Sequence, residues 1–182
     1  MSRIVPLAPA DATGSAADLL SAVQNAFGAV PNLFRVAARA PGALQGLLQL
    51  NAALGQGSLK LREREAIALA VAEANGCDYC LSAHSVLGAQ AGLGSAEIAL
   101  ARQGKSADAR LDALLRLATT LVHARGHASD EQIAAARAAG LGDAELVEVV
   151  GSVVFNLFTN YLNLLAETPI DFPVVRAGIA HA

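Results

Sequence analysis

The 182-residue sequence has little of several features that would define other classes of protein. It contains no tryptophan, and only 4% of its residues are aromatic and 16% charged, where about a quarter charged is usual. Its formal net charge of −3 argues against a nucleic-acid-binding protein, which would need clustered lysine and arginine. The N-terminal segment lacks the apolar core of a secretory signal, and no uncharged apolar run of about 18 residues indicates a membrane span. The expected compartment is therefore the cytoplasm, with no membrane partner.

The shortage of charge also has a consequence for the surface. Apolar residues make up 54% of the chain, mainly alanine, leucine and valine, which favours closely packed helices. So few polar side chains cannot cover a protein of this size, so we expect a homo-oligomer in which apolar faces are buried between subunits. The length suits one domain with a substantial core, and we predict a single domain over residues 1–182.

The apolar pattern is helical throughout, and no run of β-forming residues alternates apolar and polar positions. Glycine, proline and capping signals predict helices over 15–29, 32–40, 43–56, 58–74, 77–91, 95–103, 109–125, 129–139 and 143–167, with a break at Pro41-Gly42. Gly92-Leu93-Gly94 and Gly140-Leu141-Gly142 have similar flanking residues, which fits either duplicated helical hairpins or one common turn used twice. The predicted fold class is all-α, a bundle of several helices.

Both cysteines of the chain lie together in Cys77-Asp78-Tyr79-Cys80, and His84 follows four residues later. A helix that starts here puts both thiols in its first turn, where free N–H groups and the positive end of the helix dipole stabilise a thiolate. Cys80 and His84 then share one helix face, and the imidazole can take the thiol proton directly or through a water. On the preceding helix, Glu65 is expected opposite His84, where its carboxyl can exchange protons with the imidazole.

The spacing Glu-x11-Cys-x2-Cys-x3-His resembles the alkylhydroperoxidase D-like branch of the carboxymuconolactone decarboxylase superfamily. The segments Val30-Pro31-Asn32-Leu33-Phe34, Cys80-Leu81-Ser82-Ala83-His84 and Asn160 to Pro173 resemble peroxidase-related members of that branch. The resemblance covers residues 25–175. It implies an all-α fold, assembly into trimers or hexamers, and cysteine-dependent reduction of hydroperoxides in antioxidant defence.

Roles for single residues follow from this resemblance. It implies that Cys80 is the peroxidatic thiol, Cys77 the resolving thiol, and His84 and Glu65 the proton relay. The Cys80 thiolate becomes a sulfenic acid, which condenses with Cys77 to a disulfide, and a dithiol reductant, a lipoyl or thioredoxin-like protein, restores both thiols. No cofactor and no metal are predicted. Better-known members have a histidine between the cysteines, where this chain has Tyr79.

Other interpretations of the same residues remain open. The cysteines could form an inert buried pair or a structural disulfide, although a bridge across so short a loop constrains little chain. The four residues could ligate a metal ion, although a structural zinc site usually takes its second ligand pair from a distant segment. A decarboxylase or lactone-processing enzyme and a redox sensor with negligible turnover are the functional alternatives. Asn156, Asn160 and Asn163 share one face of the last helix and could line the active-site pocket. Such a row more often satisfies buried backbone or crosses a subunit interface, so none of the three is assigned a catalytic role.

Overall fold

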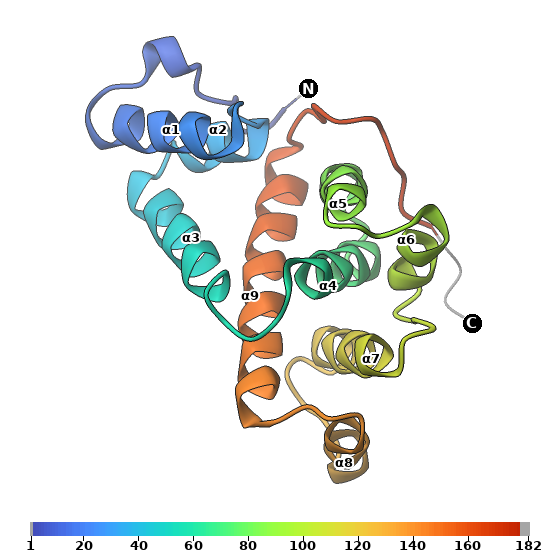
Figure 1. The fold of residues 1–182 in the computed structure, drawn as a ribbon. Helices are drawn as coiled ribbons and strands as arrows, with labels where there is room; N and C mark the ends of the chain where they lie inside the picture. Colours follow the sequence, from blue (N-terminus) through green and yellow to red (C-terminus); the bar gives the residue numbers. More distant parts are fainter. Residues whose placement is uncertain (1, 179–182) are drawn as a thin grey trace.

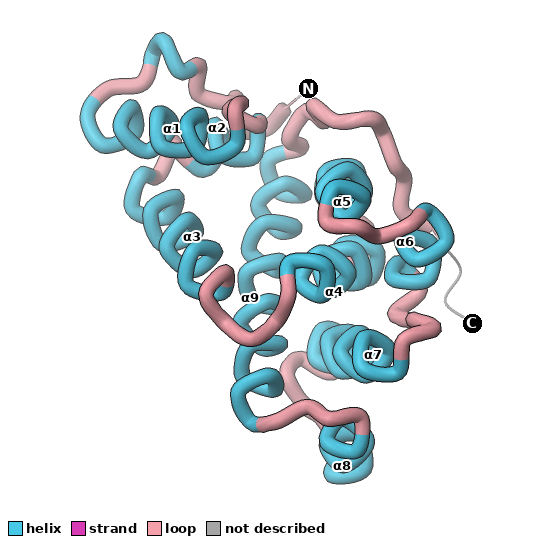
Figure 2. Tube along the Cα trace, in the orientation of Figure 1, coloured by secondary structure: helices cyan, strands magenta, loops and turns pink. Residues whose placement is uncertain are grey.

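The computed structural model describes residues 2–178, and in this part of the chain helices follow one another with no strand between them (Figure 2). A short 3-10 helix, Pro9–Asp11, comes first. The helices after it are α1 (Gly14–Phe27), α2 (Asn32–Ala37), α3 (Pro41–Leu54), α4 (Leu61–Ala74), α5 (Asp78–Gln90), α6 (Ser95–Arg102), α7 (Ala109–His123), α8 (Asp130–Ala138) and α9 (Asp143–Ala166). The all-α class predicted from the sequence is confirmed. The single domain expected over 1–182 stays a prediction.

Two helix starts differ from the sequence prediction. The expected break between two helices is present, since α2 ends at Ala37, but α3 begins at Pro41 and not at residue 43. Proline suits the first turn of a helix, where the missing N–H leaves no helix hydrogen bond unmade. α4 begins at Leu61 and not at residue 58. The backbone N–H groups of Ser58 and Leu59 donate to the Glu148 carboxylate on α9, which holds this segment outside the helix.

α9 runs through the molecule from one end to the other, and the remaining helices are arranged along it (Figure 1). It contacts α2, α3, α4, α5 and α7. The main core forms where α4 meets α5, α7 and α9, and the segment from Ala66 to Ala72 is buried almost completely. A smaller apolar cluster joins α1, α2 and α3 through Leu20, Ala37 and Leu44.

The two Gly-Leu-Gly segments form the same local turn. Gly92 and Gly140 have φ angles of 91° and 87°, in the left-handed region that favours glycine after a helix. The following leucine is buried in both turns, and the second glycine donates its N–H to the glutamate three residues later. The echo in the sequence therefore corresponds to one turn geometry at two places, between α5 and α6 and between α8 and α9.

Residues 168–178, here called the C-terminal segment, return from the end of α9 across α5 and α6 (Figure 1). The N–H of Val175 donates to Ser82 Oγ at 2.9 Å, and that of Ala177 donates to Asp78 Oδ1 at 2.8 Å. The N–H of Gly178 donates to Glu73 Oε1 at 2.7 Å. These contacts fasten the segment beside the first turn of α5.

α9 is long and apolar enough to qualify as a candidate membrane span, with a mean hydropathy of 1.4 in its most apolar window. That is weak evidence for crossing a membrane, because 44% of the window is buried inside the protein, as in a core helix.

Candidate active site

Cys77 is the N-cap residue of α5, and Cys80 lies in the first turn of the same helix. The preceding turn ends α4 at Gly76, whose φ of 66° suits glycine. The two sulfur atoms lie 2.9 Å apart, both thiols are free, and both side chains are almost completely buried. The N–H of Cys80 donates to Cys77 Sγ at 3.4 Å. The two thiols can therefore share a proton and can join with little movement of the backbone.

The two thiols differ in acidity. The pKa of Cys77 is lowered mainly because the Cys80 thiol donates a hydrogen bond to its sulfur. Burial acts in the opposite direction, and the hydrogen bond from the Cys80 N–H lowers the pKa further. Burial raises the pKa of Cys80 well above its usual value, and the neighbouring Cys77 sulfur raises it further. In the reduced pair the thiolate therefore forms first on Cys77, and the proton between the two sulfurs stays on Cys80.

Two asparagines of α9 approach Cys80 from the inside of the protein. Asn163 Nδ2 donates to Cys80 Sγ at 3.3 Å, and hydrogen bonds from Asn163 and Asn160 partly offset the effect of burial on the Cys80 pKa. Asn160 is fully buried and accepts a hydrogen bond from Asn75 Nδ2 at 2.9 Å. Sequence reasoning left both residues out of the site. The available signal was their shared face on an otherwise uncharged helix, which indicates buried amides but not what they contact.

Glu65 on α4 and His84 on α5 form a second pair, with Glu65 Oε2 2.8 Å from His84 Nδ1. Their side chains are only 13% and 15% exposed, so Glu65 is not part of a solvated helix start. Gly88 of α5 lies close to this pair, since a Cβ there would lie 3.9 Å from Glu65 Cβ and 3.1 Å from the Leu93 side chain. When Nδ1 carries the proton donated to Glu65, Nε2 of the imidazole is the nitrogen that can accept another.

The structure thus brings the four predicted residues together as two pairs. Among residues 2–178, no hydrogen bond joins His84 to either cysteine, so a proton that passes between the pairs needs a bridge such as a water. The described residues also contain no group of three or more His, Cys, Asp or Glu arranged to hold a metal ion. The four residues therefore do not form the ligand set that their spacing left open.

Tyr79, between the cysteines, is buried and joins three parts of the chain. Its hydroxyl accepts a hydrogen bond from the Leu33 N–H of α2 at 3.0 Å. Its ring meets Phe172 of the C-terminal segment edge-on, with ring centroids 5.8 Å apart. Burial raises the pKa of Tyr79, so the phenol stays protonated. This residue anchors the start of α5 to α2 and to the C-terminal segment.

A cavity of about 290 Å³, here called the thiol pocket, opens beside Cys77. Its walls include Cys77, Tyr79, Asn163, Leu164, Glu167 and Arg176, but Cys80 is not among its lining residues. Arg176 is mostly exposed and forms an ion pair of 2.7 Å with Asp78 in the first turn of α5. A small molecule that enters the pocket therefore reaches the Cys77 side of the thiol pair.

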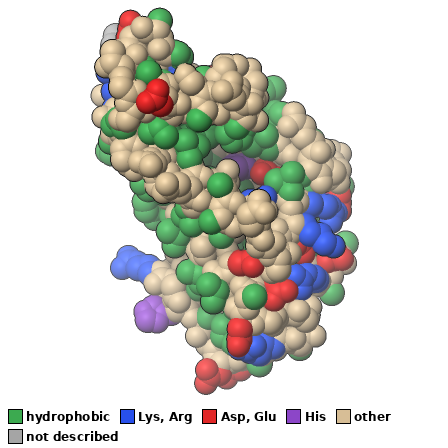
Figure 3. Space-filling view, turned by 60° about the vertical axis from the view of Figure 1, so that its left-hand side comes forward, with side chains coloured by type: hydrophobic (Ala, Val, Ile, Leu, Met, Phe, Trp, Pro, Cys, Tyr) green, Lys and Arg blue, Asp and Glu red, His purple; other side chains and the backbone are tan. Residues whose placement is uncertain are grey.

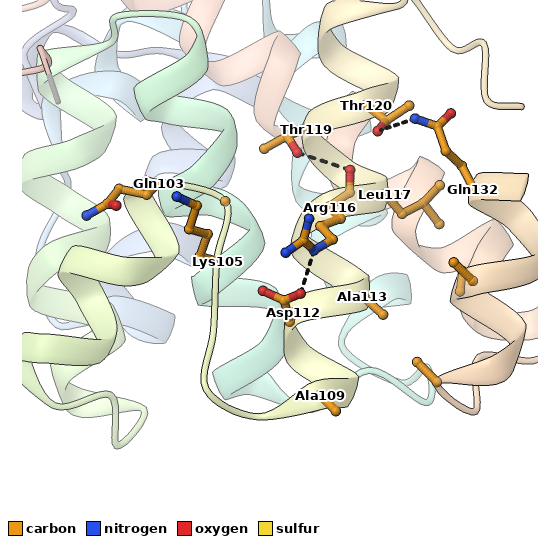
Figure 4. Close-up of a pocket in the computed structure, with 14 residues that line it drawn as sticks. Gln103, Lys105, Ala109, Asp112, Ala113, Arg116, Leu117, Thr119, Thr120 and Gln132 are labelled. Atoms are coloured by element: carbon orange, nitrogen blue, oxygen red, sulfur yellow. Dashed lines mark hydrogen bonds and ion pairs between the residues drawn. The ribbon is translucent and has the colours of Figure 1, made fainter. Parts of the chain in front are cut away.

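A larger cavity of about 560 Å³ lies between α7, α8 and the loop before α7 (Figure 4). Four of its polar side chains are paired with one another: Arg116 with Asp112, and Gln132 with Thr120. No cysteine or histidine is among its lining residues. The thiol pocket is therefore the better candidate for the chemistry.

Known proteins resemble this chain in sequence and in fold. Residues 41–119 match the model of the carboxymuconolactone decarboxylase family. The chain is similar in structure to a peroxidase-related protein from Ralstonia eutropha JMP134, described as an alkylhydroperoxidase AhpD core, with 23% identity and a TM-score of 0.81 over 93% of this chain and 92% of that one. A peroxidase-related protein from Silicibacter sp. TM1040 gives 22% identity and a TM-score of 0.79, covering 92% and 91% of the two chains. No curated protein sequence matches the chain.

The debrominase Bmp8, solved in complex with 2,3,4-tribromopyrrole, is a further structural neighbour. It shares 17% identity and a TM-score of 0.78 over 94% of this chain and 92% of its own. At such identities the likeness concerns the fold. The family match, by contrast, spans all four of Glu65, Cys77, Cys80 and His84. Residues 41–119 are thus similar to the carboxymuconolactone decarboxylase family, and the chain has the fold of the AhpD-like, peroxidase-related structures.

Proposed function

We propose that this protein is a thiol-dependent peroxidase that reduces hydroperoxides through a dithiol–disulfide cycle of Cys77 and Cys80. The observation that carries the proposal is the contact of two free thiols, 2.9 Å apart at the start of a helix, with a cavity beside them. One thiol of lowered pKa next to a second thiol is the arrangement that dithiol chemistry requires.

In the proposed cycle Cys80 attacks the peroxide and Cys77 resolves. Cys77 is already ionised, and the Cys80 proton then passes through a water to the imidazole of the Glu65–His84 pair. The Cys80 thiolate then bonds to one peroxide oxygen, the O–O bond breaks, and the alkoxide takes the proton back to leave as an alcohol. The Cys77 thiolate attacks the resulting sulfenic sulfur, hydroxide leaves as water after protonation, and the disulfide forms.

Two observations favour the opposite order of attack. Cys77 has the lower pKa, and Cys77, not Cys80, lines the thiol pocket. The two orders differ in which cysteine becomes the sulfenic acid. Trapping with dimedone after one equivalent of peroxide separates them: adduct formation in Cys77→Ser but not in Cys80→Ser supports attack by Cys80, and the reverse pattern supports attack by Cys77.

The cycle needs a partner that supplies electrons. We propose a dithiol reductant, a lipoyl or thioredoxin-like protein, that attacks the disulfide at Cys77, since this sulfur lines the thiol pocket. The proposed compartment is the cytoplasm, where such reductants keep thiols free. Assembly into trimers or hexamers is part of the same proposal.

Reductive debromination is a second candidate function, favoured by the structural likeness to Bmp8. Two thiols can supply the two electrons that replace a carbon–bromine bond by a carbon–hydrogen bond, and the cycle again ends in a disulfide and bromide. Decarboxylation, which the family name suggests, does not use a pair of thiols.

The decisive experiment measures dithiol-dependent consumption of cumene hydroperoxide and H₂O₂ by the wild type and by single variants. We expect no turnover by Cys77→Ser or Cys80→Ser, a loss of about 100-fold for His84→Ala, and a loss of about 10-fold for Glu65→Gln. His127→Ala, on an exposed loop, is the matched control and should keep full activity.

Each other outcome has a defined meaning. Peroxidase activity that survives Cys80→Ser rejects Cys80 as the attacking thiol. A wild type that forms the disulfide reversibly without turnover is a redox sensor. Consumption of a bromopyrrole in the absence of peroxide turnover identifies the second candidate function.

A further inference from the structure

One face of α9 exposes most of the large apolar side chains that the described residues leave open to solvent. These side chains recur at helical spacing and form a continuous line, here called the α9 stripe: Val147, Val150, Val154, Phe158, Tyr161, Leu164 and Leu165, which are 42–71% exposed. No Asp, Glu, Lys or Arg occurs from Val149 to Ala166. The stripe therefore contains no charge along most of a 24-residue helix.

The stripe has the size of a protein interface. Its side chains expose on the order of 700 Å², while a standard interface buries roughly 800 Å² of each partner. The largest apolar patch of an ordinary monomer is about 300–600 Å². In Figure 3 most charged side chains lie in the middle and lower parts of the view, with a few near the top, so charge is distributed unevenly over this side of the molecule. A patch of this extent is expected to be covered in solution.

The order of small and large residues along the stripe indicates what covers it. The N-terminal half carries three valines, Val147, Val150 and Val154, whereas the C-terminal half carries Phe158, Tyr161 and two leucines. We propose that the α9 stripe is a two-fold interface, in which α9 of one copy packs antiparallel against α9 of a second copy of this chain. Each valine then faces a large residue of the other copy.

The register of such a pairing follows from the residue numbers. Val147 faces Leu165, Val150 faces Tyr161, and Val154 faces Phe158 of the other copy. All three pairs have their midpoint at or next to Asn156, as a single two-fold axis requires, and each pair occurs twice. Parallel packing would instead set each large residue against its own copy and valine against valine, which leaves gaps at one end and crowding at the other.

The charges at the two ends of α9 are compatible with this arrangement. Asp143 is paired with Arg137 at 2.6 Å at one end, and Glu167 is paired with Arg3 at 2.8 Å at the other. Antiparallel packing brings the two ion pairs next to each other without unbalanced charge, and it opposes the two helix dipoles.

The proposed interface also reaches the thiol pocket. Leu164 belongs to the α9 stripe and lines the pocket, and its neighbour Asn163 donates to Cys80 Sγ. In the antiparallel register the first turn of the other copy's α9 lies beside Leu164. Assembly would thus build part of the mouth of the pocket from the second subunit.

Analytical ultracentrifugation at micromolar concentration tests the interface. We expect an even number of subunits for the wild type and a dissociation constant raised about 100-fold or more in Val154→Glu and in Phe158→Glu. Val174→Glu is the matched control, because Val174 is 58% exposed outside the stripe. Circular dichroism checks that each variant is folded. Of the two assemblies proposed for this chain, a hexamer can contain the two-fold interface and a trimer cannot. A wild type that is a monomer or a trimer therefore overturns the inference, as does binding of the monomer to anionic vesicles that Val154→Glu abolishes.

Cross-linking tests the antiparallel register in a background with both native cysteines changed to serine. Chains with Val147→Cys should cross-link to chains with Leu165→Cys, but not to each other, since two Val147 positions would lie about 27 Å apart. Chains with Val154→Cys should cross-link to chains with Phe158→Cys. Efficient cross-linking of Val147→Cys to itself would show parallel packing and reject the register.

Discussion

At the scale of single residues, the two cysteines differ because one proton lies between sulfur atoms in unequal surroundings. Cys77 caps α5, and its sulfur accepts a hydrogen bond from the Cys80 N–H and lies 2.9 Å from the Cys80 sulfur. Burial raises the pKa of Cys80, which receives its donor from Asn163 of α9. The pair therefore ionises in two separated steps, the first on Cys77 and the second on Cys80.

Replacement of Cys80 tests the origin of the first step. Cys80→Ser keeps a hydroxyl that can donate to Cys77, whereas Cys80→Ala keeps nothing. We expect the pKa of Cys77 to increase in the order wild type, Cys80→Ser, Cys80→Ala, because its thiolate loses its donor. The thiolate absorbance as a function of pH measures this directly. Equal values for Cys80→Ser and Cys80→Ala would show that the shared hydrogen bond does not lower the Cys77 pKa.

Replacement of Asn163 tests the second step. Asn163→Leu keeps the size of the side chain and removes the donor to Cys80, so the second ionisation of the pair should move to higher pH while the first stays in place. Peroxide turnover at neutral pH should fall by about 10-fold if Cys80 attacks. Asn156→Leu is the control, since Asn156 donates to the Ser152 carbonyl and not to a sulfur. A parallel shift of both ionisations in Asn163→Leu would instead indicate a general loss of packing.

Part of this site could be predicted from the sequence and part could not. The helix start at Cys77 and the nearness of Glu65 to His84 follow from one helical hairpin, in which spacing alone determines the neighbours. The contact of Asn163 with Cys80 spans 83 residues and depends on how α9 is rotated against α5. No local pattern contains that rotation, so the thiol pocket and the asparagines emerge only from the fold.

At the scale of elements, the start of α4 depends on a carboxylate of α9. Glu148 accepts hydrogen bonds from the N–H groups of Ser58 and Leu59 and from the Ser58 hydroxyl, at 2.9–3.1 Å. Gly57 allows this approach, because a Cβ at that position would lie 2.6 Å from the carboxylate. The sequence places a helix start at residue 58 because a capping pattern cannot register a partner ninety residues away.

Glu148→Gln should lower the free energy of unfolding by about 1–2 kcal/mol at neutral pH, since it replaces a charged acceptor of several hydrogen bonds. Burial raises the pKa of Glu148, but the hydrogen bonds from Ser58 and Leu59 lower it by more, so the net shift is downward. The folded pKa therefore lies below the unfolded one, and the stabilisation is present above the unfolded pKa and disappears as the pH falls through the folded pKa. Urea unfolding at several pH values should show this, with exposed Asp18→Asn as control. If the unfolding free energy lost in Glu148→Gln stays constant as the pH falls, the loss comes from packing and not from the charge of Glu148.

At the scale of the whole molecule, the low content of charged residues and the exposed apolar face of α9 both show that a single chain leaves apolar surface uncovered. The composition predicts that apolar surface is buried between subunits, but it does not say where. The location of this apolar surface depends on which side of α9 faces inward. The side that carries Asn156, Asn160 and Asn163 packs against the other helices. The valine-rich and aromatic side is left for a second copy.

Pairing along the α9 stripe predicts that stability depends on protein concentration. Unfolding of a dimer releases two chains, so mass action stabilises the folded state as concentration rises. A hundredfold increase should raise the Tm of the wild type by about 3 °C for a chain of this length. Val154→Glu should show a lower Tm without this dependence, and Val174→Glu should behave as the wild type. Differential scanning calorimetry over that range of concentration provides the measurement, and a wild-type Tm that does not change with concentration would contradict a dimer whose folding and assembly are coupled.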